Sequence, residues 1–235
     1  MSNRVKAVIP LMIAVGVVAF LWCELALNFT FHWVTVADGV FGKFGLPEHL
    51  QLVLPASFVT WGLFFLLGAD GRALRNTLIA ATTGSIAAAV VMALGPALAR
   101  APQFWGIAVA VGVVGAVLVL LSTAVADDSL SPAPAFACGG TVLMWWVATG
   151  LDNYVADGKG PHTVAALVAA LTKTPLAAGT GALGGLISTP WPWVAISVWV
   201  TLLCGAGLGV VSGALAQALG RVTAPTVAAG EPAPQ

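Results

Sequence analysis

Long apolar segments of about 20 residues, separated by short polar breaks, constrain this chain more than any other feature of its sequence. A helix needs about 20 apolar residues to cross the hydrocarbon core of a bilayer, and soluble domains seldom contain such runs. The composition agrees, because 59% of the 235 residues are hydrophobic and only 8% are charged. The sequence therefore predicts a polytopic membrane protein with the lipid bilayer as its surroundings.

The apolar segments divide the chain into six expected spans. In lipid every backbone polar group needs an internal partner, and the segments are too long and alternate too little to be barrel strands. The predicted fold class is an all-α integral membrane protein with a six-transmembrane-helix bundle over residues 1–222. A long outer loop at 152–192 has room for an interfacial or re-entrant helix, and the tail at 223–235 is expected to be disordered. The spans are expected at about residues 7–27, 52–68, 78–98, 105–125, 135–151 and 193–219.

The charged residues exclude one class of partner and suggest an orientation. Nine Lys and Arg balance nine Asp and Glu, so the chain has no basic field for nucleic acid. Basic residues favour the cytoplasmic side of a membrane. We expect an uncleaved first span and an inner (plasma) membrane protein with both termini in the cytoplasm. That orientation keeps Arg4, Lys6, Arg72, Arg75 and Arg221 inside and places Lys43, Arg100, Lys159 and Lys173 outside.

The second and fifth spans share a pattern of proline, tryptophan, glycine and aspartate. The second carries Pro55, Trp61 and the segment 68–70, and the fifth carries Trp145-Trp146 between Pro134 and the segment 150–152. Two units of three helices must insert with opposite orientations, as in the inverted repeats of many transporters. The pattern predicts an inverted 3+3 repeat, and chance similarity among helices rich in Gly, Ala and Trp is the alternative.

Several of these motifs resemble the YcdZ-like bacterial inner-membrane proteins, which carry domain of unknown function 1097. The resemblance covers residues 10–150 and 193–220, and the loop at 152–192 looks like an addition to the family pattern. It implies a membrane location and no settled chemistry, and it transfers no functional residue. The motifs are Trp22 in the first span, the segment Ser57-Phe58-Val59-Thr60-Trp61-Gly62-Leu63-Phe64-Phe65, the turn glycines Gly68 and Gly71, and Gly95-Pro96-Ala97-Leu98.

A polar stripe in and after the first span is the main candidate site. Glu24, Asn28 and His32 are spaced four residues apart and share one face if the helix continues past Leu27. A carboxylate within a span has to face a cavity, pair with another group or become protonated. We expect the stripe to line a solute pathway, together with Trp61 and Trp146, unless Glu24 only reaches the headgroups.

Other chemistry finds little support in the sequence. The spacing of His32 and His49 with Glu24 matches no metal motif, so we expect no metal, no catalytic residue and no cofactor. The G-x-G-x-x-G match at 179–184 lacks the strand and helix that a dinucleotide site needs. Gly205, Gly209 and Gly213 form a helix-packing face, and Cys23, Cys138 and Cys204 are expected to be packing residues.

These features predict a small-solute channel or a simple secondary transporter rather than an enzyme. The expected partners are a small-molecule solute and further copies of the chain in a homo-oligomer. The alternative is a non-transporting structural or accessory subunit of a membrane protein complex.

Overall fold

The described part of the chain is entirely helical. The computed structural model describes residues 3–30, 50–98, 105–124, 130–148 and 191–223. Each expected span overlaps one helix in these ranges, which confirms the all-helical prediction there. The helices are α1 (Asn3–Asn28), α2 (Leu54–Leu66), α3 (Gly71–Leu98), α4 (Trp105–Ala124), α5 (Pro132–Ala148) and α7 (Trp191–Thr223).

The helices differ in whether they can cross a membrane. Four of those described are long and apolar enough to do so, namely α1, α3, α4 and α7. By contrast, α2 has 13 residues and α5 has 17. At the helical rise, α2 is about 20 Å long, which is less than the roughly 30 Å of a hydrocarbon core. Helix α2 alone is therefore too short to cross that core.

A tight turn joins α2 to α3 and moves the start of α3 ahead of the expected residue 78. Gly68 and Ala69 both have positive φ, and the Ala69 N–H donates to the carbonyl of Phe64 at 2.9 Å. The Asp70 carboxylate then accepts from the Ala73 N–H at 2.7 Å. This side-chain cap satisfies a backbone donor of the first turn, so α3 begins at Gly71.

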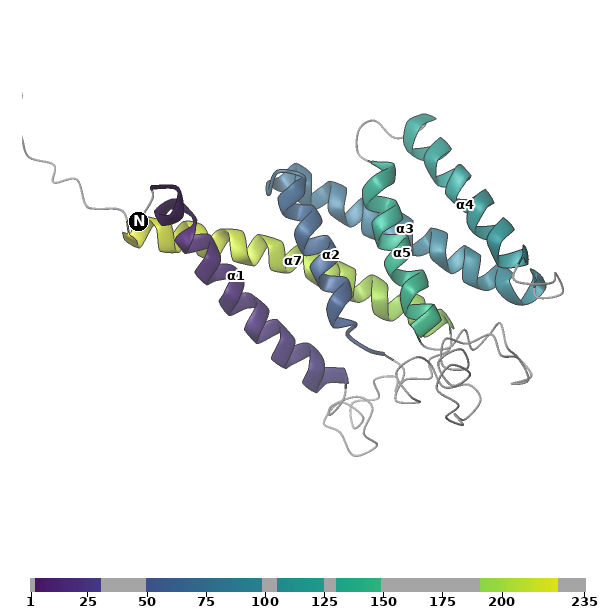
Figure 1. The fold of residues 1–235 in the computed structure, drawn as a ribbon, viewed down its shortest axis with the longest axis horizontal. Helices are drawn as coiled ribbons and strands as arrows, with labels where there is room; N and C mark the ends of the chain where they lie inside the picture. The colour runs from purple at the N-terminus through teal and green to yellow at the C-terminus, as the bar shows by residue number, and fades with distance from the viewer. Residues whose placement is uncertain (1–2, 31–49, 99–104, 125–129, 149–190, 224–235) are drawn as a thin grey trace, which may run out of the picture.

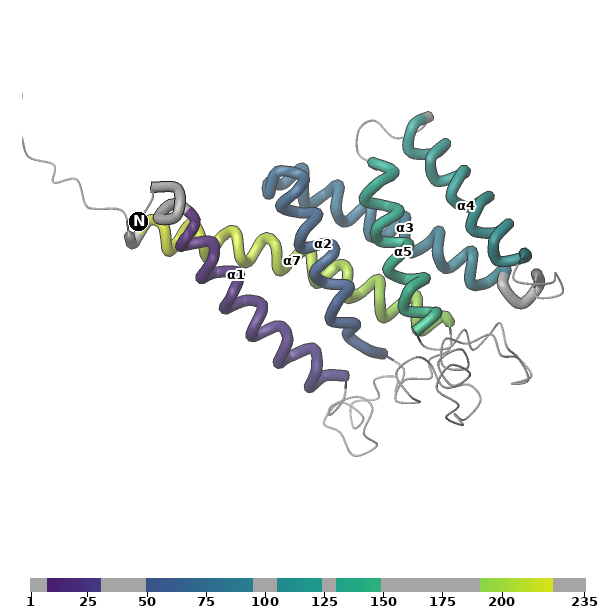
Figure 2. The backbone as a smooth tube through the Cα atoms, in the orientation of Figure 1, coloured from purple at the N-terminus to yellow at the C-terminus, as the bar shows by residue number. Residues whose placement is uncertain are grey.

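The bundle has a regular pattern of helix pairs. The most extensive pairings are α2 with α7 and α3 with α5. The outer helix α1 packs mainly on α7, and α4 packs mainly on α3. Figures 1 and 2 show α1 and α4 at opposite ends of the long axis, with α2 and α5 between them. The two long helices α3 and α7 contact each other and connect the two ends.

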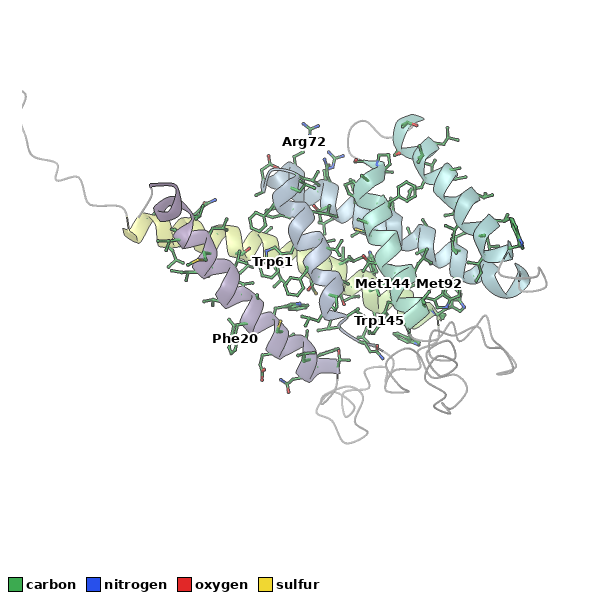
Figure 3. All side chains as sticks on the ribbon, in the orientation of Figure 1. Phe20, Trp61, Arg72, Met92, Met144 and Trp145 are labelled. Atoms are coloured by element: carbon green, nitrogen blue, oxygen red, sulfur yellow. The ribbon has the colours of Figure 1, made fainter. Side chains whose placement is uncertain are left out.

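The apolar side chains follow this arrangement. The core joins α2, α3, α5 and α7 through residues that include Ala56, Met92, Trp146 and Leu202, all at most 2% exposed. Large apolar side chains also cover the outside, such as Phe20 at 70% exposure, which points away from the bundle (Figure 3). An outer surface of this kind suits contact with lipid tails, where apolar exposure costs nothing.

Candidate functional site

A buried non-helical segment, residues 50–53, leads into α2. Gln51 is 4% exposed and Val53 is 2% exposed, although neither lies in a helix. Backbone polar groups buried without a partner are costly, and in a membrane no water is present to satisfy them. The surrounding helices therefore have to supply hydrogen bonds to this segment.

Three hydroxyl groups from two helices supply those bonds. Ser197 Oγ accepts from the Gln51 N–H at 3.0 Å, and Thr201 Oγ1 accepts from the Val53 N–H at 3.0 Å. From the end of α1, Thr30 Oγ1 accepts from the Leu52 N–H at 2.9 Å. We call residues 50–53 with Thr30, Ser197 and Thr201 the α2 junction. It satisfies consecutive backbone donors at the start of a short helix.

Two of the junction hydroxyls donate a hydrogen bond as well as accept one. Thr201 donates to the carbonyl of Ser197 at 2.7 Å, one turn earlier in α7. Thr30 donates to the Leu52 carbonyl at 3.3 Å. Each hydroxyl has one proton and two lone pairs, so donating within the protein leaves a lone pair for the α2 backbone. The junction contains hydrogen-bonding groups and no ionisable side chain.

Two tryptophans continue the polar contacts along α2. Trp22 on α1 donates its indole N–H to Ser57 Oγ at 2.8 Å, and Ser57 donates to the Leu54 carbonyl at 2.7 Å. Trp61 donates to Ser212 Oγ on α7 at 3.0 Å. These bonds fix α2 against α1 on one side and α7 on the other.

Glycines allow the closest backbone approaches of the bundle. A Cβ at Gly205 would collide with the Ser57 carbonyl oxygen and Thr60 Oγ1, and one at Gly209 would collide with the Phe64 ring. These two positions confirm the predicted packing face, whereas a Cβ at Gly213 would meet nothing within 4 Å. Between α3 and α5, a Cβ at Gly84 would collide with the carbonyl oxygen of Ala135.

The residues predicted for a solute pathway fall into two groups. Glu24 lies on the exposed side of α1, where Asn28 donates to its carboxylate at 3.0 Å and to its backbone carbonyl at 2.8 Å. His32 lies outside the described residues, so the full stripe stays a prediction. Trp61 and Trp146 lie inside the bundle at 4% and 2% exposure.

The sequence analysis missed the α2 junction. The sequence features that could have indicated it are Ser197 and Thr201, one helical turn apart in an apolar span, and Gln51, four residues before Pro55. No sequence rule pairs hydroxyls with backbone donors 146 and 148 residues away. The three cysteines are free, with Cys138 buried and Cys23 and Cys204 partly buried.

Comparisons with protein-family models, with curated proteins and with solved structures find no match to this chain. The resemblance to YcdZ-like proteins rests on the sequence motifs given above.

Proposed function

We propose that the protein is a small-solute channel or simple secondary transporter of a bacterial inner membrane, built as an inverted repeat of α1–α3 and α4–α7. The observation that carries the proposal is the exchange symmetry of the helix pairs. Exchanging α1 with α4, α2 with α5 and α3 with α7 converts the α2–α7 pair into the α5–α3 pair. The same exchange converts the α1–α7 pair into the α4–α3 pair.

The glycine contacts support the same correspondence at residue level. Gly205 of α7 lies against the Ser57 carbonyl of α2, and Gly84 of α3 lies against the Ala135 carbonyl of α5. Matching Ser57 with Ala135 also matches Phe58 with Phe136 and Gly62 with Gly140, but it pairs Trp61 with Gly139 and so does not keep the tryptophan of the predicted pattern. This matched glycine contact supports the repeat over the alternative of chance similarity among helices of similar composition.

The short helix α2 adds a second line of support. In transporters with inverted repeats, unusually short or interrupted hydrophobic segments at corresponding positions of the two halves mark the solute site. Here α2, with 13 residues, is such a short segment, and it is the second helix of its half in the proposed repeat. Non-helical backbone at membrane depth is tolerated where protein or a water-filled cavity surrounds it. The α2 junction meets this condition, because hydroxyl groups of the surrounding protein satisfy its backbone donors.

The proposal includes a topology and an assembly. We assign six spans with both termini in the cytoplasm, on the distribution of Lys and Arg, and a homo-oligomer. The exposed carboxylate of Glu24, on an otherwise apolar face of α1, supports contact with a further copy because such a group is costly in lipid. Membership of the YcdZ-like proteins is part of the same proposal.

Uptake into proteoliposomes tests the function. The purified protein is reconstituted and screened with small neutral and anionic metabolites, and the solute that enters is then followed in variants. Thr201→Val removes the acceptor of the Val53 N–H and is expected to change the uptake rate several-fold. The matched control is Thr123→Val, because Thr123 on α4 bonds only to carbonyls of its own helix among the contacts seen. Absence of uptake for every solute class, with folded protein in the liposomes, contradicts the proposal.

A non-transporting accessory subunit is the second candidate. The exposed Glu24 on the apolar outer face of α1 fits a contact with a different membrane protein as well as with a second copy. Purification in mild detergent distinguishes them. One fixed partner in constant ratio, lost in Glu24→Leu, favours the accessory subunit over the transporter.

A further inference from the structure

The side of α1 that faces away from the bundle carries a continuous stripe of exposed residues. The buried side of the helix is formed by Ala14, Val18, Trp22 and Ala26, all at most 8% exposed. The opposite side repeats with alternating steps of four and three residues, and Figure 3 shows Phe20 of this side pointing away from the neighbouring helices. We call it the outer stripe of α1. Its members are Ile13, Val17, Phe20, Glu24 and Leu27.

The outer stripe has the spacing of a helix-packing seam. Residues that repeat in steps of four and three follow the contact line of two helices that cross at a small left-handed angle, in coiled coils and in membranes. The four apolar residues alone would suit lipid equally well. Glu24 decides between the two, because it lies one turn inside the apolar span Val8–Asn28 and a carboxylate is costly in lipid.

No cation of the described helices lies near Glu24. The α2 junction brings together the end of α1 and the starts of α2 and α7. The basic residues occupy the opposite ends of α1 and α7, and the start of α3 at the far end of α2. In the described part of the chain they are Arg4, Lys6, Arg72, Arg75 and Arg221. Asn28 donates to Glu24 Oε1 but brings no positive charge. The carboxylate therefore needs a partner from outside the described helices.

We propose that the outer stripe of α1 packs against the same stripe of a second copy, with the two helices parallel and their Glu24 carboxyl groups in contact. A two-fold interface brings each residue of such a stripe close to its own counterpart. Both copies insert with the same orientation in the proposed topology, which makes the helices parallel. One proton, taken up from water and shared between the two Glu24 carboxyl groups, supplies a hydrogen-bond donor, because carboxylates in contact do not both ionise.

This inference rests on the homo-oligomer within the proposed function and names the contact that forms it. The two fail separately. An oligomer detected by light scattering that has no contact through α1 contradicts the inference and leaves the homo-oligomer in place. Absence of solute uptake contradicts the proposed transport and leaves the α1 contact in place.

Cysteine cross-linking of the full-length protein in phosphatidylcholine vesicles, at a low ratio of protein to lipid, tests the contact. Leu27→Cys places a thiol in the outer stripe, and Cys23→Ala removes the native thiol of α1. Copper phenanthroline is expected to convert this variant into a disulfide-linked dimer. Leu25→Cys in the same background is the matched control, because Leu25 and Leu27 are 45% and 44% exposed but lie on different sides of α1. Equal cross-linking of both variants, or of neither, overturns the proposal.

Substitutions of Glu24 test its part in the contact. Energy transfer between donor-labelled and acceptor-labelled copies in the same vesicles measures the dimer affinity. Glu24→Leu is expected to lower the affinity about 3- to 30-fold, as loss of an interhelical hydrogen bond does. Glu24→Gln is expected to retain it, because an amide both donates and accepts. Unchanged affinity in Glu24→Leu assigns the carboxylate to the lipid headgroups and overturns the proposal. So does a different protein, bound in constant ratio and lost in Glu24→Leu.

Discussion

The indole N–H of Trp61 donates to Ser212 Oγ across 3.0 Å, and this bond joins α2 to a residue of α7 that is 151 positions away. Ser212 is fully buried, and its hydroxyl donates a hydrogen bond to the Gly209 carbonyl at 3.0 Å. The Trp61 ring also stacks on Phe58, with centroids 5.7 Å apart. One side chain thus combines apolar packing with a directional bond that fixes the height of α2 along α7.

Ser212→Ala is expected to destabilise the protein by about 1–3 kcal/mol, because it leaves the buried indole N–H of Trp61 without an acceptor. Thermal unfolding in a fixed detergent measures the change. Ser122→Ala is the control, since Ser122 is also buried but donates to the Val119 carbonyl of its own helix. Trp61→Phe combined with Ser212→Ala is expected to cost less than the sum of the single changes. Full additivity in this double-mutant cycle contradicts a coupled pair.

Two glycines of α7 are expected to respond to alanine in opposite directions. Gly205→Ala puts a Cβ onto the Ser57 carbonyl oxygen, which is backbone and cannot move without separating α2 from α7. We expect a large loss of folded protein. Gly213→Ala meets no neighbour within 4 Å, and alanine is the better helix former by up to about 1 kcal/mol. Yield and melting temperature of both variants, prepared side by side, check the contrast, and equal behaviour contradicts it.

The sequence predicted the helices better than their interactions. Apolar runs predicted a helix in each described range, because the cost of unsatisfied backbone in lipid leaves few other structures. Helix α3 begins at Gly71, before the span expected at about 78–98, because the Asp70 carboxylate caps its first turn. The α2 junction was missed because its hydrogen bonds join residues far apart in the chain. The i, i+4 spacing of Glu24 and Asn28 predicted that the two share one helix face, and the structure contains a hydrogen bond between their side chains.

Reporter fusions test the proposed topology. A fusion at Gln235 and one near Asp157 are expected to lie on opposite sides of the membrane, because one expected span, residues 193–219, separates them. One reporter is active only in the cytoplasm and another only outside it, so their activities show on which side each fusion site lies. If both sites report the same side, α5 or α7 does not cross as assigned. The two halves are then not inserted with opposite orientations, which contradicts the inverted repeat.

Glu24→Gln is the sharpest test of a solute pathway at α1. The glutamine oxygen still accepts from Asn28, which bonds to the carboxylate at 3.0 Å, so the change removes a charge and keeps the local contact. Glu24 lies on the exposed side of α1, so a pathway that includes it has to be closed by a second copy of the chain. We therefore expect Glu24→Gln to change the uptake rate or its pH dependence without changing the melting temperature, and Asn28→Leu to block uptake by removing the polar contact.

Arg75→Gln, on the exposed side of α3, is the control for loss of a surface charge. Unchanged uptake by Glu24→Gln over the whole pH range excludes Glu24 from the pathway, whereas altered uptake with an unchanged oligomer places its charge beside the moving solute.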